Sequence, residues 1–76
     1  MANMQFLRKL AYDELYDTLF FATGQIPVRT KSDEFWTVTA GPFSVKIVHN
    51  RNISVNGDRC KSTPEAKFVI QEFLVV

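Results

Sequence analysis

Apolar residues recur at helical spacing over the first third of the chain. Leu7, Leu15 and Leu19 are separated by multiples of four and lie on one face. No glycine or proline interrupts the stretch, and Gly24 follows it where a helix is commonly capped. The pattern predicts a helix over about residues 5–22.

An aromatic row runs beside that face: Tyr12, Tyr16 and Phe20, each four residues from the last. A helix that is apolar over so much of its circumference is either buried on two sides or offers one side to a partner. The row therefore either thickens the core or forms a docking face for another protein, or a homodimer seam, which Phe68 would extend. The sequence leaves both interpretations open.

Alternation of apolar and polar residues predicts strands in the middle of the chain. Trp36, Val38 and Ala40 occupy every second position before Gly41-Pro42, and the alternation resumes after that break. Asn56-Gly57 is typical of a type I′ hairpin turn, because both central residues of that turn need positive φ. The predicted strands span about residues 34–40, 43–49 and 52–56, and residues 58–61 form either a short fourth strand or an irregular return.

Residues 25–33 are predicted to connect the first helix to these strands. Pro27 prevents the helix from resuming. Ile26 and Val28 could pack beneath this segment or pair briefly as a sheet edge.

Ser62-Thr63-Pro64-Glu65 marks the start of a closing helix, predicted over about residues 63–75. Either Thr63 caps the helix with Pro64 at its first position, or Ser62 and Glu65 form a capping box. The stripe of this helix that faces the core is expected to comprise Ala66, Val69, Ile70, Phe73 and Leu74.

These elements predict a single α+β domain over residues 1–76, of order α-β-β-β(-β)-α. It would be a small antiparallel meander with the N- and C-terminal helices packed on one face. The expected core consists of Trp36, Val38, Val45, Ile47, Ile53 and Val55 from the sheet and Leu7, Leu15, Leu19, Val69, Ile70 and Phe73 from the helices.

Composition favours a small cytoplasmic domain. The chain is 46% apolar and 13% aromatic, which is enough to build a core in 76 residues. Cys60 is the only cysteine, so no internal disulfide can form, and a reducing compartment is expected. We expect no membrane association, because neither a signal peptide nor an apolar stretch of about 18–20 residues is present.

The residues available for catalysis or metal binding are few. Cys60 and His49, the only histidine, lie on neighbouring predicted strands and could meet, but no third group orients them. One cysteine and one histidine do not supply the three or four ligands of a zinc site. The three glycines are isolated and form no phosphate loop. We therefore expect a protein that is not an enzyme and uses no cofactor or metal.

Basic residues form a second candidate surface, which would bind nucleic acid. They come from the predicted hairpins and from the start of the last helix: Lys46, Arg51, Arg59, Lys61 and Lys67. Alternatively, these charges lie on the outer face of the sheet and only keep the protein soluble. The net charge of +1 argues against a strongly basic nucleic-acid binder.

The order helix, three strands, helix over about 70 residues resembles the double-stranded-RNA-binding domain. Gly41-Pro42 is similar to the Gly-Pro of that family, and residues 61–67 are similar to the lysine-bearing segment that opens its last helix. The resemblance implies phosphate contacts by Lys61 and Lys67 across a major groove. Glu65 departs from the family pattern, as does the net acidic first helix.

The expected function is therefore a small protein-binding module acting as a regulator, inhibitor or accessory subunit, with another protein or a second copy as its partner. Small chains of this kind are common among phage and mobile-element products, although no residue indicates that origin. Nucleic-acid binding through the basic residues is the alternative.

Overall fold

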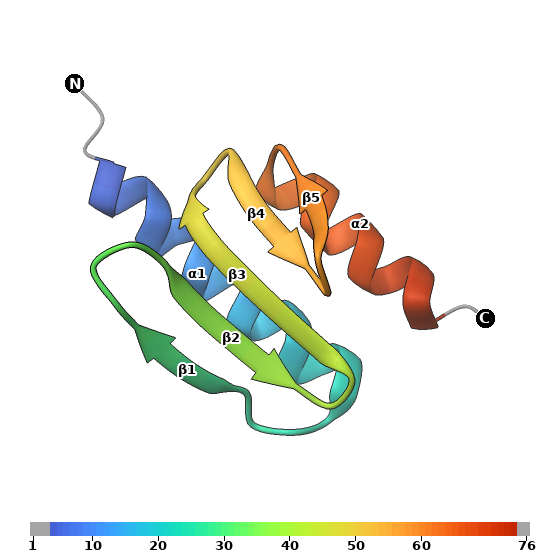
Figure 1. The fold of residues 1–76 in the computed structure, drawn as a ribbon. Coiled ribbons are helices and arrows are strands. Elements are labelled where there is room, and N and C mark those ends of the chain that lie inside the picture. The colour runs from blue at the N-terminus through green and yellow to red at the C-terminus, as the bar shows by residue number, and fades with distance from the viewer. Residues whose placement is uncertain (1–3, 75–76) are drawn as a thin grey trace.

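The computed structural model describes residues 4–74 as two helices and a five-stranded antiparallel sheet (Figure 1). The elements are α1 (Met4–Thr23), β1 (Val28–Lys31), β2 (Trp36–Ala40), β3 (Phe43–His49), β4 (Asn52–Val55), β5 (Asp58–Cys60) and α2 (Thr63–Leu74). The strands pair in sequence order, β1-β2-β3-β4-β5. This confirms the predicted α+β meander with a helix at each end, although residue 75 of the predicted last helix lies outside the described residues.

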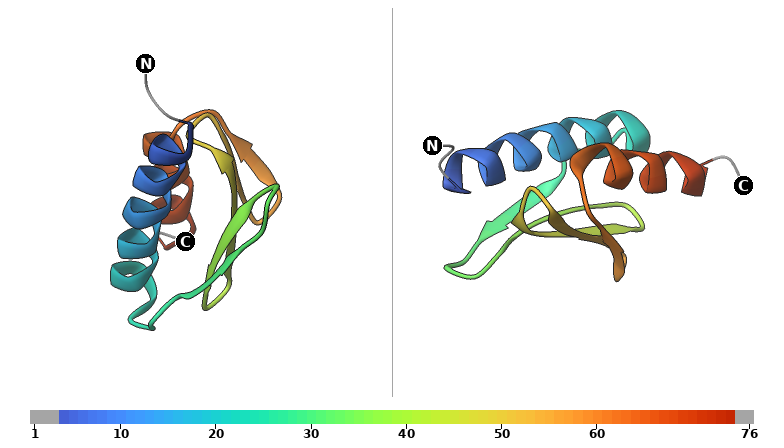
Figure 2. Two further views of the ribbon diagram at one scale, coloured as in Figure 1. Left: turned by 90° about the vertical axis from the view of Figure 1, so that its left-hand side faces the viewer. Right: turned by 90° about the horizontal axis from the view of Figure 1, so that it is seen from above.

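Both helices lie on the same face of the sheet (Figure 2). Helix α1 packs on β2 and β3, α2 packs on β4 and β5, and the helices contact one another. Lys67 Nζ of α2 lies 3.2 Å from Glu14 Oε2 of α1 along this contact. Within residues 4–74, no helix covers the opposite face of the sheet.

Strand β1 was not predicted as a full strand, and it raises the strand count from the expected three or four to five. Its pairing with β2 runs from Val28 opposite Thr39 to Lys31 opposite Trp36. The connecting turn uses no glycine or asparagine: the backbone N–H and the hydroxyl of Ser32 both donate to the carbonyl oxygen of Phe35, at 3.0 and 2.7 Å. The sheet therefore also exceeds the three strands expected from the resemblance to the double-stranded-RNA-binding domain.

The predicted turns and caps take their expected form. Asn56 and Gly57 have φ of 51° and 89°, as the type I′ turn requires, and β5 follows as a true strand. Ser62, and not Thr63, caps α2, because its hydroxyl accepts the N–H of Glu65 at 3.3 Å. Glu65 Oε2 in turn accepts the N–H of Lys61 at 2.9 Å.

The core lies between the helices and the inner face of the sheet. Most of the predicted core is fully buried: Val38, Val45, Ile47, Ile53, Val55, Leu15, Leu19 and Ile70. Trp36 and Val69 are partly buried against it, and Leu7, which was also predicted to be in the core, is only partly buried. Phe73 and Leu74 were both predicted to face the core, but each is 50% exposed. Phe73 lies at the rim and packs edge-on against Phe43, with ring centres 5.7 Å apart.

Candidate functional site

The predicted aromatic row on α1 does not form one surface. Tyr12 is only 2% exposed and belongs to the core, Tyr16 is partly buried, and Phe20 is exposed. Strand β1 is the reason, because it extends the sheet beneath this side of α1. The ring of Tyr12 packs edge-on against that of Trp36, with centres 5.0 Å apart. The guanidinium of Arg29 covers the ring of Tyr16 at 4.4 Å.

The exposed large apolar side chains of the helical layer come from both helices, and Phe20 is the only member of the predicted row among them. Phe21 is the most exposed of these side chains, at 84%, and packs edge-on against Phe20. Phe68, the other predicted docking residue, is also exposed. We call the full set the helical apolar surface: Phe6, Leu10, Phe20, Phe21, Phe68, Phe73 and Leu74.

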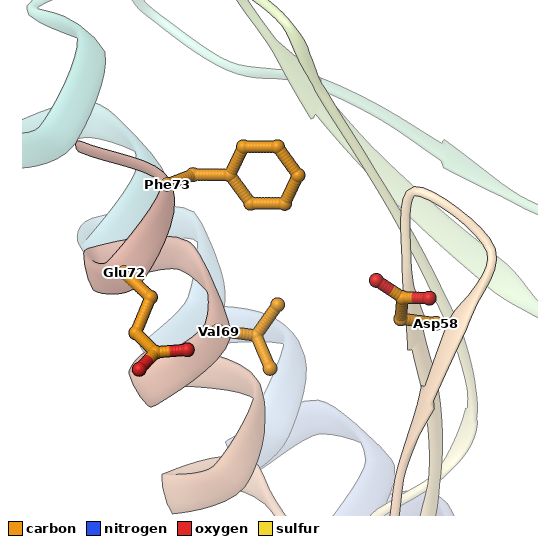
Figure 3. A pocket seen from close by; sticks show the side chains of 4 residues that line it. All are labelled: Asp58, Val69, Glu72 and Phe73. Carbon is orange, nitrogen blue, oxygen red and sulfur yellow. The ribbon is translucent and has the colours of Figure 1, made fainter. Parts of the chain in front are cut away.

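Two shallow grooves adjoin the helical apolar surface. One lies between the helices, has a volume of about 340 Å³, and includes Phe21, Leu74 and Lys67 among its lining residues. The other, of about 310 Å³, separates α2 from the β4–β5 hairpin. In that groove Val69 and Phe73 extend from the helix towards the sheet, and the carboxylate of Asp58 lies on the sheet side (Figure 3). Glu72 lines the same groove, so an apolar floor is accompanied by two carboxylates.

The five predicted nucleic-acid-binding residues do not form a continuous patch. Lys46 and Arg59 share the outer sheet face, where Thr30, Thr37, Lys46, Ser54 and Arg59 stand in register across all five strands. Arg51 lies in the β3–β4 turn, Lys61 follows β5, and Lys67 pairs with Glu14 in the helical layer. The outer face is thus polar and weakly basic, and the last helix contributes little to it.

A cationic pocket of about 320 Å³ between α1 and β1 was not predicted from the sequence. It is lined by Lys9, Tyr12, Asp13, Arg29 and Lys31. The alternation Arg29-Thr30-Lys31 would place two cations on one face of a strand. That spacing alone could not show that this face meets α1.

Cys60 and His49 do not lie on neighbouring strands as expected, because β4 lies between β3 and β5. Cys60 is fully buried, and burial raises the pKa of its thiol, as do the nearby carboxylates of Glu65 and Asp58. A protonated, enclosed thiol is a poor nucleophile. His49 instead accepts the N–H of Arg51 on Nδ1 at 3.0 Å.

Residues 4–74 contain no helix that is both long and apolar enough to cross a membrane. The same part of the chain holds no group of three or more histidine, cysteine or acidic residues that could bind a metal ion. No protein-family model matches the chain, and no significant match was found among curated proteins or solved structures.

Proposed function

We propose that this domain is a non-enzymatic protein-binding module that docks its partner on the helical apolar surface, as a regulator, inhibitor or accessory subunit. The observation that carries this proposal is the exposure of seven large apolar side chains, each 40–84% exposed, on two adjacent helices. Scattered apolar residues are ordinary on a protein surface, but here Phe20 and Phe21 pack against each other and Phe21 and Leu74 line one groove. Exposed apolar side chains that are grouped in this way are typical of a partner site. Phe20, Phe21 and Phe68 also supply the aromatic character that is enriched in interfaces.

The groove beside α2 indicates the chemistry of the partner. Val69 and Phe73 offer an apolar floor, and Asp58 and Glu72 add negative charge to the same groove. A lysine or arginine side chain suits this combination, because its stem is apolar and its head is cationic. The partner is therefore expected to present an apolar segment with at least one basic residue.

The decisive experiment compares two surface variants in binding to the partner. Phe21→Ser with Phe68→Ser removes the two most exposed aromatic side chains of the helical apolar surface. Val28→Ser is the matched control, because Val28 is 62% exposed but lies on the outer sheet face opposite Thr39. Proteins that co-purify with the wild-type chain would be identified and their affinities measured by calorimetry.

We expect the double variant to bind at least about tenfold more weakly and Val28→Ser to bind like wild type. Partners that bind all three chains equally would refute the proposal. A wild-type chain that captures no protein beyond those retained by the double variant would also refute it.

Nucleic-acid binding is the second candidate, and it is favoured by the shared register of Lys46 and Arg59 on the outer sheet face. Lys46 also lies 4.3 Å above the ring of Phe35, which could stack on a base. Lys46→Ala with Arg59→Ala should then weaken binding and reduce its salt dependence, measured by fluorescence anisotropy. Lys67→Ala is the control, because Lys67 pairs with Glu14 in the helical layer. Absence of binding at low salt would exclude this candidate.

A further inference from the structure

The cationic pocket is organised by the register of β1 against β2. Arg29 stands opposite Val38 and Lys31 opposite Trp36, and both of these β2 residues face the helices. Since paired residues of an antiparallel ladder point to the same face, Arg29 and Lys31 are directed towards α1. There they meet Lys9, Tyr12 and Asp13.

Aromatic rings hold the cations in place. Lys31 Nζ lies 4.5 Å from the ring centre of Trp36 and 5.6 Å from that of Tyr12. Arg29 lies over the rings of both Tyr12 and Tyr16, and Arg8 lies 5.2 Å from the Trp36 ring centre. These contacts position the side chains without neutralising their charge, so the pocket is partly preorganised for an anion.

The hydroxyl of Tyr12 has no hydrogen-bond partner among the described residues, although the side chain is almost completely buried. Leaving a buried hydroxyl unpaired is energetically costly, and the described residues supply no partner for it, so a ligand could provide one. Arg29 and Lys31 beside it are exposed. Tyr12 lines the same pocket as these two residues, so a ligand bound between them would lie next to its side chain.

The charge of the pocket favours a doubly charged ligand. Three cations against the single carboxylate of Asp13 leave a net charge of +2. Asp13 neutralises Arg29 only loosely, because the closest atoms are 3.8 Å apart and both side chains are about half exposed. Lys9 and Lys31 make no ion pair among residues 6–74. Lysine, arginine and tyrosine donors together suit the several acceptor oxygens of a phosphate monoester.

We infer that the pocket between α1 and β1 binds a phosphate monoester dianion, with Lys9, Arg29 and Lys31 contacting its oxygens and the Tyr12 hydroxyl donating a hydrogen bond to it. This site is separate from the helical apolar surface and does not depend on the proposed docking function. Burial raises the pKa of the Tyr12 hydroxyl, and Arg29 opposes that shift while Asp13 adds to it. The hydroxyl therefore stays protonated, as a donor must be.

Binding can be followed by the emission of Trp36, the only tryptophan, whose ring contacts Lys31. Inorganic phosphate is titrated into the full chain at constant ionic strength, with adenosine 5′-monophosphate and adenosine as the other ligands. We expect saturable binding of both phosphate compounds with a Kd of about 1 mM or tighter, and none of adenosine. Tighter binding of the nucleotide would assign a nucleoside monophosphate as the ligand, and equal binding would assign the phosphate group alone.

Variants separate a binding site from a merely structural cluster. Tyr12→Phe retains the ring and should weaken phosphate binding about tenfold, as should Lys31→Gln. Lys46→Gln, on the opposite face of the sheet, should leave the affinity unchanged. Because Lys31→Gln alters the surroundings of Trp36 directly, calorimetry supplies the second measurement. The inference is overturned by non-saturable binding, by equal binding of adenosine, or by equal losses in Lys31→Gln and Lys46→Gln.

Discussion

At the scale of single residues, burial decides which groups are chemically active. Cys60 is enclosed between β5 and α2 and keeps its thiol proton, so its contribution is to the core. Tyr12 is equally enclosed but retains an unpartnered hydroxyl. Burial therefore makes the Cys60 thiol a poor nucleophile, whereas the Tyr12 hydroxyl can still donate a hydrogen bond to a ligand.

The raised pKa of Cys60 predicts a loss of stability in alkali. The unfolded thiol releases its proton around its ordinary pKa of 9.0, while the folded protein retains that proton to higher pH. The free energy of unfolding should therefore be unaffected by this group below about pH 8.5 and should fall as pH rises towards the folded pKa. Urea denaturation measured from neutral to alkaline pH gives the profile.

Cys60→Ala provides the control for that profile. The variant should be less stable at neutral pH, because it leaves a small cavity, but its stability should fall less between about pH 8.5 and pH 10. A decline as steep as that of the wild-type chain would show that another group causes it.

Sequence periodicity could identify the buried residues at the centre of the sheet but not those at its edge. Val45 and Ile47 alternate on β3 and are buried as predicted. Tyr12 was open to two interpretations, because its environment depends on β1, a strand that lies beneath it only in the folded chain. Phe73 has the spacing of a core residue, but its place at the rim leaves it half exposed.

At the scale of elements, the two adjacent hydroxyl residues at the start of α2 differ in their contribution to capping the helix. Ser62→Ala should reduce the free energy of unfolding by about 1 kcal/mol, because it removes the acceptor of the Glu65 N–H. Thr63→Ala should have a much smaller effect, since Thr63 is the first helical residue and not the cap. Thermal or urea denaturation of the two variants tests this. Equal losses would contradict the assignment of the cap.

Strand β1 should be the least stable strand of the meander. All four of its side chains are exposed, and it pairs on one side only. Its amide protons are therefore expected to exchange faster than those of β3, which is paired on both sides. Native-state hydrogen exchange measures the difference. Equal protection of β1 and β3 would show that β1 opens only when the whole domain unfolds.

This exposure also explains why β1 was not predicted as a full strand. A strand without a buried side has no alternation of burial to detect, and its turn at Ser32–Phe35 contains neither glycine nor asparagine. By contrast, the Asn56-Gly57 turn was predicted because its backbone conformation demands particular residues. The cationic pocket depends on β1 and was missed with it.

At the scale of the whole molecule, the two faces differ in character. The helical layer exposes large apolar side chains, whereas the outer face of the sheet presents rows of threonine, serine and basic residues. We expect the weight-average mass in sedimentation equilibrium to rise with protein concentration, because the helical apolar surface can pair with itself. Phe21→Ser with Phe68→Ser should abolish the rise, and Val28→Ser should not. A constant monomer mass would exclude self-association through this surface.

The sequential pairing of the strands has a consequence for the order of folding. Every strand pairs with its neighbour in the chain, so the meander requires only short loop closures. The seam between α1 and α2, in contrast, brings together the two ends of the described chain. We therefore expect the hairpins to be formed in the rate-limiting step and this seam to be completed afterwards. Substitutions along the seam would then accelerate unfolding with little effect on the refolding rate, so the lifetime of the folded state would be set where the two helices meet.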